Sequence, residues 1–243
     1  MTSGPPGARP ARGEQTRSLI LETALRLFRE RGYGATTMRA VASEAGVSVG
    51  SAYYYFDSKE HLVQAFYDRT QEEHVLASAP VLAAETSFAA RLLGVMRARV
   101  DTLAPYQEFA GSFFQVAADP ASPLSPFSAE STPAREASVA LFAEVVRGSG
   151  LRVAPELADD LPELLWLYCM GVVLFWVHDS SPAAARTHRL VERTVPMLDR
   201  LLGLARLRLL RPVVRDLVEL VRELRDVPGA GEAGPATARP RGR

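Results

Sequence analysis

Apolar residues recur every three or four positions along most of this chain, and that spacing predicts a protein built from α-helices. The first such helix is expected from Glu14 to Arg31, with Gly32 ending it. Its apolar stripe consists of Leu19, Ile20, Thr23, Ala24, Leu27 and Phe28. Neither the apolar–polar alternation of strands nor an Asn-Gly hairpin turn stands out in the sequence. The pattern therefore predicts an all-α fold.

Two short helices separated by a glycine are predicted next. Thr37 is placed to cap a helix from Met38 to Ala45, which Gly46 then breaks. Ser48 is placed to cap a second helix from Val49 to Tyr54. A helix, a tight turn and a second helix are typical of the helix-turn-helix arrangement, whose second helix enters the major groove of DNA.

The remainder of the chain is predicted to form a long helix and then a helical bundle. The long helix begins at Asp57 and Ser58, where Asp57 and Glu60 have capping-box spacing, and reaches about Ala77. Further helices, three of them with a proline in the first turn, are predicted over Ser87–Leu103, Pro105–Ala117, Pro133–Arg147, Glu156–Val177, Pro182–Leu202 and Leu207–Leu224. The chain is therefore expected to contain a helix-turn-helix domain over 14–60 and a larger helical domain over 61–228.

Composition is that of an ordinary globular protein. The 243 residues are 47% hydrophobic and 23% charged, with no net charge. Residues 1–56 hold seven arginines against four glutamates, a surplus of three positive charges that weakly favours an anionic partner. Both ends are rich in Gly, Pro and Arg, so we expect a disordered arm over 1–13 and a disordered tail over 229–243. Without a signal-peptide core or an apolar run long enough to span a bilayer, we expect a cytoplasmic protein with no membrane partner.

Hydroxyl groups and aromatic rings gather where a recognition helix would meet duplex DNA. Ser48 and Ser51 lie at a helix N-terminus, which favours phosphate. The hydroxyls of Tyr53 and Tyr54 have the reach for phosphate oxygens, and such contacts position a protein without reading sequence.

Base contacts are expected from Val49, Ser51, Tyr53 and Arg39, and Lys59 can meet the DNA backbone. A structural interpretation stays open for part of this set, because Arg39 can equally be a solvated surface residue. Tyr54 can equally be a structural ring. Tyr55 and Phe56 are expected to be core residues.

Signs of an enzyme are weak. The four histidines do not have metal-ligand spacing, no glycine loop for phosphate and no nucleophile elbow occurs, and Cys169 lies in an apolar run. We therefore expect no catalytic residues, metal or cofactor. A helical protein–protein interaction module without DNA binding is the main alternative, and a small helical enzyme is the least favoured.

These residues resemble the N-terminal domain of the tetracycline-repressor (TetR) family of transcriptional regulators. The resemblance rests on the first-helix stripe with Phe28 and Gly32, and on Thr36-Thr37, Val41-Ala42, Ala45-Gly46-Val47-Ser48, Gly50-Ser51, Tyr53-Tyr54-Tyr55-Phe56 and Ser58-Lys59-Glu60. It covers about a quarter of the chain. The DNA contacts that it implies fall on Thr37, Arg39, Ser48, Val49, Ser51, Tyr53, Tyr54 and Lys59.

The resemblance also implies a helical regulatory domain over 61–228 that binds a small effector and dimerises through its last long helices. Aromatic residues that could line an effector cavity, although each can equally be plain core, are Phe66, Phe109, Phe113, Phe114, Tyr168, Phe175 and Trp176. No charge cluster is visible in these helices, which predicts a largely apolar effector. The helices near 156–177 and 182–202 are apolar enough to form a homodimer interface, with a monomeric core helix as the alternative. The expected function is a ligand-responsive repressor on a pseudo-palindromic DNA operator.

Overall fold

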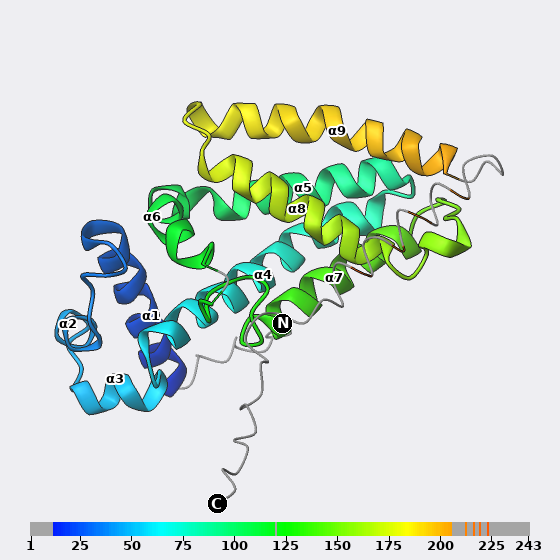
Figure 1. The fold of residues 1–243 in the computed structure, drawn as a ribbon. Coiled ribbons are helices and arrows are strands. Elements are labelled where there is room, and N and C mark those ends of the chain that lie inside the picture. The colour runs from blue at the N-terminus through cyan, green and yellow to red at the C-terminus, as the bar shows by residue number, and fades with distance from the viewer. Residues whose placement is uncertain are drawn as a thin grey trace, which may run out of the picture.

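The structure is a computed structural model that describes residues 12–119 and 121–205, together with positions 212, 216, 219 and 223. Every regular element within the two continuous ranges is a helix, so the all-α prediction is confirmed. Figure 1 shows a small group of helices, α1 to α3, at one end of the molecule and a larger group, α5 to α9, at the other, with α4 running between them. We call these two groups the head and the body.

The head consists of α1 (Arg12–Arg31), α2 (Met38–Glu44) and α3 (Val49–Tyr55). The two predicted caps are in place. The Thr37 hydroxyl accepts from the Ala40 amide at 3.2 Å, and the Ser48 hydroxyl accepts from the Ser51 amide at 3.0 Å. The turns after α1 and α2 are made by Gly32 and Gly46, whose φ angles of +81° and +69° favour glycine. Local sequence signals therefore fix the start of both short helices.

The long helix α4 (Lys59–Ala84) differs from its prediction at both ends. Its cap is Ser58, whose hydroxyl accepts from the His61 amide at 3.3 Å, and not Asp57. The helix also continues seven residues beyond Ala77 and includes Pro80. The added residues contact α5, since the Leu82 carbonyl accepts from Arg91 and Val81 lies beside Gly94.

The body contains α5 (Phe88–Leu103), α6 (Gln107–Ala117), α7 (Thr132–Arg147), α8 (Leu161–Val177) and α9 (Ala185–Leu204). Short 3-10 turns precede three of them, at Ala104–Tyr106, Pro155–Leu157 and Pro182–Ala184. The helices predicted from Glu156 and Pro182 therefore start later than expected. The predicted helix Leu207–Leu224 and the predicted tail lie outside the continuously described residues, as does the arm up to residue 11. Residues 12 and 13, assigned to the arm, belong to α1.

The turn between α8 and α9 is fixed by one buried carboxylate. Asp179 accepts from the amide and hydroxyl of Ser181 through Oδ1, at 2.9 and 2.6 Å. Its Oδ2 accepts from the amide and hydroxyl of Thr187, at 2.8 and 2.7 Å. These four hydrogen bonds hold the pKa of Asp179 well below its usual value against the opposing effect of burial.

Two hydrophobic cores hold the molecule together. One contains the inner faces of α1 to α4 and also takes in Phe113 and Ala117 of α6 and Leu124 of the following loop. The other lies among α5, α7, α8 and α9 and includes Trp166 and Trp176. Because α6 belongs to the head core, the head is packed directly against part of the body. No helix within the described residues has the length and apolar character needed to cross a bilayer.

Candidate functional site

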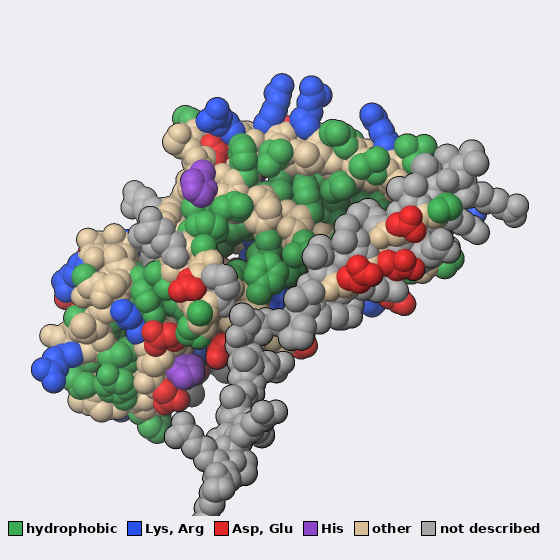
Figure 2. All heavy atoms as spheres, in the orientation of Figure 1, with side chains coloured by type: hydrophobic (Ala, Val, Ile, Leu, Met, Phe, Trp, Pro, Cys, Tyr) green, Lys and Arg blue, Asp and Glu red, His purple; other side chains and the backbone are tan. Residues whose placement is uncertain are grey.

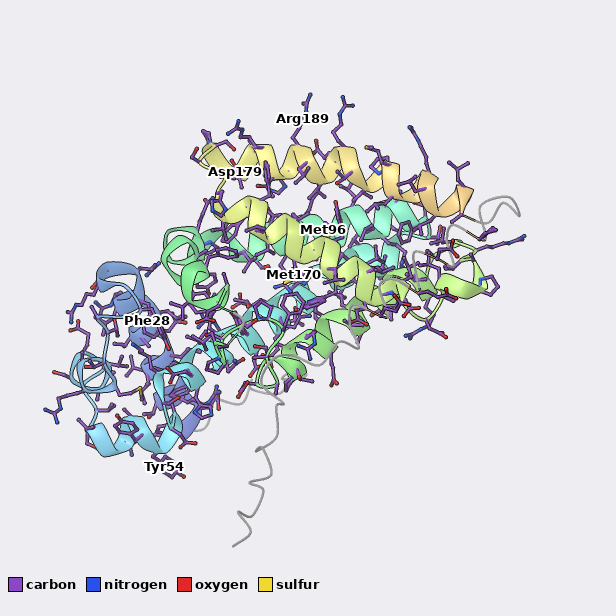
Figure 3. The ribbon with its side chains drawn as sticks, viewed as in Figure 1. Phe28, Tyr54, Met96, Met170, Asp179 and Arg189 are labelled. Atoms are coloured by element: carbon purple, nitrogen blue, oxygen red, sulfur yellow. The ribbon has the colours of Figure 1, made fainter. Side chains whose placement is uncertain are left out.

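The outer face of α3 and the start of α2 form an exposed surface on the head. Tyr54 is 81% exposed, Tyr53 47% and Val49 40%, which is high for large apolar side chains. Figure 3 shows Tyr54 projecting from α3 away from the rest of the protein. The side chains of Thr37, Arg39 and Ser48 are also exposed, and that of Ser51 is half-buried. Seven of the eight predicted DNA contacts thus lie on or next to this surface.

The four consecutive aromatic residues have divided roles. Phe56 is buried in the head core under the guanidinium of Arg17, which lies 5.0 Å from its ring centre. Tyr55 is half-buried and packs against the same core. Ala52, on the inner face of α3, is fully buried. Side chains on one face of α3 therefore anchor it, while Tyr53 and Tyr54 remain free to meet a partner.

Lys59, the eighth predicted contact, has a structural task as well. Its ammonium donates to the carbonyls of Tyr33 and Thr36, at 2.7 and 3.1 Å, and lies 4.0 Å from the Tyr33 ring centre. The Tyr33 hydroxyl donates to Glu60 at 2.8 Å, and burial together with that carboxylate raises the pKa of Tyr33. The start of α4 is therefore fastened to the segment that leads into α2, which the sequence did not reveal.

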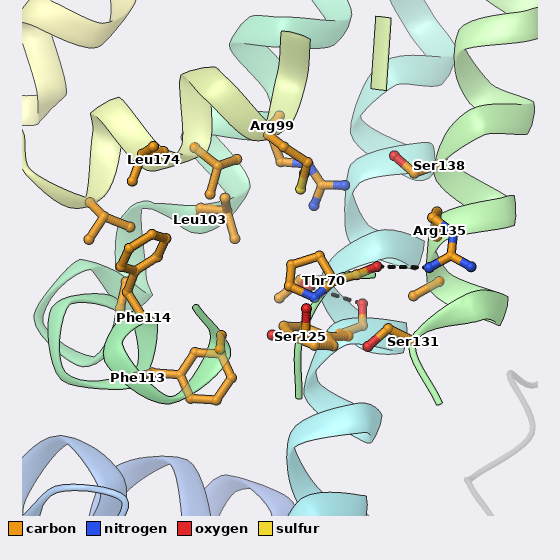
Figure 4. Close-up of a pocket in the computed structure, with 18 of the residues that line it drawn as sticks. Thr70, Arg99, Leu103, Phe113, Phe114, Ser125, Ser131, Arg135, Ser138 and Leu174 are labelled. Atoms are coloured by element: carbon orange, nitrogen blue, oxygen red, sulfur yellow. Dashed lines mark hydrogen bonds between the residues drawn. The ribbon is translucent and has the colours of Figure 1, made fainter. Parts of the chain in front are cut away.

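A cavity of about 740 Å³ lies in the body between α4, α5, α6, α7, α8 and the loop after α6 (Figure 4). This volume is within the range of small-molecule sites. Among the predicted effector residues, Phe66, Phe113, Phe114 and Trp176 line it. Tyr168 instead bonds to the Thr194 hydroxyl of α9 at 2.5 Å, and Phe175 lies 42% exposed on the outer surface. The Phe109 side chain is outside the described residues.

Several lining residues were missed by sequence reasoning. Ser125, Pro126 and Phe127 come from the loop after α6, and two cations, Arg99 and Arg135, come from α5 and α7. Figure 4 shows these two arginines on different helices around one space. The prediction of a largely apolar effector rested on the absence of a charge cluster along the sequence, whereas the fold places both of these charges on the wall of one cavity.

Some side chains of the head core also line the cavity. Phe113 belongs to both, and its ring centre lies 6.3 Å from that of Tyr33 and 5.9 Å from that of Tyr67. Phe66 also belongs to both, with its ring centre 4.8 Å from that of Tyr106. A molecule in the cavity would therefore touch side chains that support the head.

Helices α8 and α9 carry exposed apolar side chains. Figure 2 shows hydrophobic side chains gathered over these two helices. They are Leu167, Leu174 and Phe175 on α8 and Met197, Leu201 and Leu204 on α9, each between 37% and 58% exposed. On α9 the three side chains repeat every three or four residues and form a stripe, whereas Leu167 and Leu174 on α8 also line the cavity. An exposed patch of this kind marks an interaction surface.

Comparisons with known proteins agree with this geometry. The family described as "Bacterial regulatory proteins, tetR family" matches residues 20–66, and "Tetracyclin repressor-like, C-terminal domain" matches residues 91–224. The HTH-type transcriptional regulator TtgR of Pseudomonas putida is 43% identical over 61 residues, or 25% of this chain and 29% of that protein. The HTH-type transcriptional repressor KstR2 of Rhodococcus jostii is 47% identical over 60 residues, or 24% of this chain and 29% of that protein.

The similarity to these two relatives thus spans less than a third of their length. Over a larger part of the chain, the solved structure of the fatty acid degradation regulator FadR from Bacillus halodurans has the same fold. It superposes with a TM-score of 0.58 at 18% identity, covering 76% of this chain and 96% of that one.

Proposed function

We propose that this chain, which belongs to the tetracycline-repressor (TetR) family of bacterial transcriptional regulators, is a homodimeric repressor that leaves its operator when a small effector fills the body cavity. The family consists of DNA-binding regulators and not of enzymes. The observation that carries the proposal is the exposed surface of α2 and α3, which presents hydroxyls, two tyrosine rings and Arg39 from a helix-turn-helix. Because its ligand is chromosomal DNA, we place the protein in the cytoplasm.

On this surface the contacts divide by chemistry. Thr37, Ser48, Tyr53 and Tyr54 supply hydroxyls for phosphate oxygens, and these contacts set the position of α3 on the duplex. Val49 and Ser51 at the start of α3 and Arg39 on α2 would meet base edges. Lys59 can add a phosphate contact through its remaining hydrogen while it keeps its two carbonyl partners.

The dimer would form through the apolar stripe of α9 and the exposed apolar side chains of α8 beside it. Two copies of these helices related by a two-fold axis make a four-helix interface. A helix-turn-helix dimer reads two half-sites about 34 Å apart, one turn of B-DNA, so the dimer also sets the spacing of the two heads. An effector acts by favouring a dimer whose heads have a different spacing, and only to the extent that it binds that state more tightly.

Effector occupancy would reach the head through Phe113. Its ring lies against Tyr33, and Tyr33 is tied to Lys59 and Glu60 at the start of α4. A shift of α6 is therefore passed to the junction of α4 with the segment before α2. This route is short, and each contact in it is a packed ring or a hydrogen bond.

The test is fluorescence anisotropy with labelled DNA from the intergenic region beside the gene, at several salt concentrations. We expect Arg39→Gln, which removes a base contact, to weaken binding by about 1–3 kcal/mol and to relax specificity at one base position. Tyr53→Phe, which removes a phosphate contact, should weaken binding about equally on all sequences. Arg147→Gln is the matched control, because Arg147 is an exposed arginine at the end of α7, outside both the head and the proposed dimer interface, and should leave binding unchanged. Equal weakening by the head variants and the control would refute the proposed surface, as would equal affinity for unrelated DNA.

A further inference from the structure

The cavity has an apolar wall that is interrupted by two cations and, among its described lining residues, no Asp or Glu. Arg135 is the less informative of the two, since its guanidinium donates to the Pro126 carbonyl at 3.0 Å and to the Thr132 hydroxyl at 2.9 Å. Arg99 is only 7% exposed, and its Nη2 donates to the amide oxygen of Gln71. A neutral amide does not compensate a buried positive charge.

A second buried arginine on α5 shows what a satisfied guanidinium looks like in this protein. Arg91, two turns before Arg99, is 4% exposed and donates to four backbone carbonyls. These are the carbonyls of Val145 at 3.1 Å, Leu82 at 2.5 Å, Glu85 at 2.9 Å and Glu144 at 2.9 Å. Arg99 has the Gln71 oxygen and the neighbouring Cys169 thiol, and its Nε has no hydrogen-bond partner within the described residues. Arg91 therefore has a structural role, while Arg99 lacks an anionic partner.

Other polar groups around the cavity also have atoms without a hydrogen-bond partner among the described residues. Buried atoms without a partner among the described residues include Gln71 Nε2, Ser138 Oγ and Trp176 Nε1, all on lining residues. Each of them, like Arg99 Nε, carries a hydrogen that it can donate. With Arg99, these groups give the wall unpaired donors, which favours a ligand that brings acceptor atoms.

We propose that the effector is an amphiphilic acid whose carboxylate pairs with Arg99 and whose apolar body fills the cavity along Phe113, Phe114 and Trp176. This inference rests on the proposed function, in that it names the chemical class of the effector for the same cavity. A carboxylate supplies two acceptor oxygens that match the geometry of a guanidinium. The apolar body explains why aromatic and aliphatic side chains make up most of the wall.

The test compares matched acids and alcohols by titration calorimetry at pH 8 in the absence of DNA. The probe pairs are decanoate with decan-1-ol and 2-naphthylacetate with 2-(2-naphthyl)ethanol, so that each pair shares one apolar body. We expect at least one acid to bind, about tenfold or more tighter than its alcohol, since a hydrogen bond to a charged group contributes about 1.5–3 kcal/mol.

Two arginine variants on α5 locate the effect. Arg99→Met should weaken the acid about tenfold or more and leave the alcohol nearly unchanged, and retained alcohol binding shows that the cavity is intact. Arg97→Met is the matched control, because Arg97 is 47% exposed and pairs with Glu192 on the surface, so both ligands should bind as in the wild type.

Three results would overturn the proposal: alcohols that bind as tightly as their acids, no binding by either acid, or equal loss of acid binding in the two variants. The wild-type comparison decides the matter even if Arg99→Met does not fold. Because the calorimetry contains no DNA, its result does not depend on whether the protein is a repressor. Acid binding that leaves operator affinity unchanged would refute release by the effector while supporting the pairing with Arg99.

Discussion

Acidification from pH 7 to pH 5 should destabilise this protein through one buried histidine. His74 on α4 is fully buried beside Arg99, its Nε2 bonds to the Val95 carbonyl at 2.8 Å, and its Nδ1 has no partner within the described residues. Burial, reinforced by the charge of Arg99, lowers the pKa of His74 from 6.5 to about 3. The folded protein therefore holds this imidazole neutral at both pH values.

The sign and size of the effect follow from proton binding. Between pH 6.5 and 3 the unfolded chain binds a proton at His74 and the folded chain does not, so acid favours unfolding. The contribution of His74 is constant above pH 6.5 and falls by up to about 1.4 kcal/mol for each pH unit below it. From pH 7 to pH 5 the loss in the free energy of unfolding is about 2 kcal/mol.

Urea unfolding of the wild type and His74→Gln at both pH values, at one chain concentration, isolates this contribution. Glutamine can donate to the Val95 carbonyl but takes up no proton, and the remaining groups titrate in both proteins. We expect the decrease in stability from pH 7 to pH 5 to be smaller in His74→Gln by about 2 kcal/mol. The same decrease in both proteins would refute the reasoning.

Two further predictions concern packing within the body. Gly94→Ala should destabilise by about 1–3 kcal/mol, because the added Cβ would lie 2.4 Å from Cγ2 and 2.9 Å from Cβ of Val81, so no rotamer relieves the clash. Gly111→Ala, with nothing within 4 Å of its Cβ, should stabilise α6 by up to about 1 kcal/mol, and shifts of equal sign in thermal unfolding would contradict this account. Asp179→Asn should cost about 1.5–3 kcal/mol in chemical denaturation at pH 7, since the carboxylate accepts four hydrogen bonds, and an unchanged midpoint would show that it does not fix the α8–α9 turn.

Helix starts could be read from the sequence because their causes are local. Thr37 and Ser48 each cap the helix that their position predicts. Helix ends were less predictable: α4 was expected to end near Ala77, yet it continues through Pro80 to Ala84. Packing of α4 along α5, which includes the close approach at Gly94, outweighs the local penalty of a proline.

Only part of the cavity lining could be predicted from the sequence, because its walls come from segments far apart in the chain. Helical spacing does not say which aromatic residues face inward, so Phe113 was placed correctly beside the cavity while Tyr168 faces α9. Helical spacing places Arg99, but not Arg97, on the apolar face of α5 with Val95 and Met96. The sequence does not say that a cavity lies beside that face, because the cavity is formed by several helices packed together.

The central claim is that two heads of one dimer read two half-sites of an operator. Hydroxyl-radical footprinting on the intergenic DNA beside the gene, combined with the mass of the complex in solution, tests it most directly. We predict two protected half-sites about 10 base pairs apart, or a small multiple of this spacing, related by two-fold symmetry and bound by chains in even number. A single protected half-site bound by one chain, or uniform protection without a preferred site, would contradict the account.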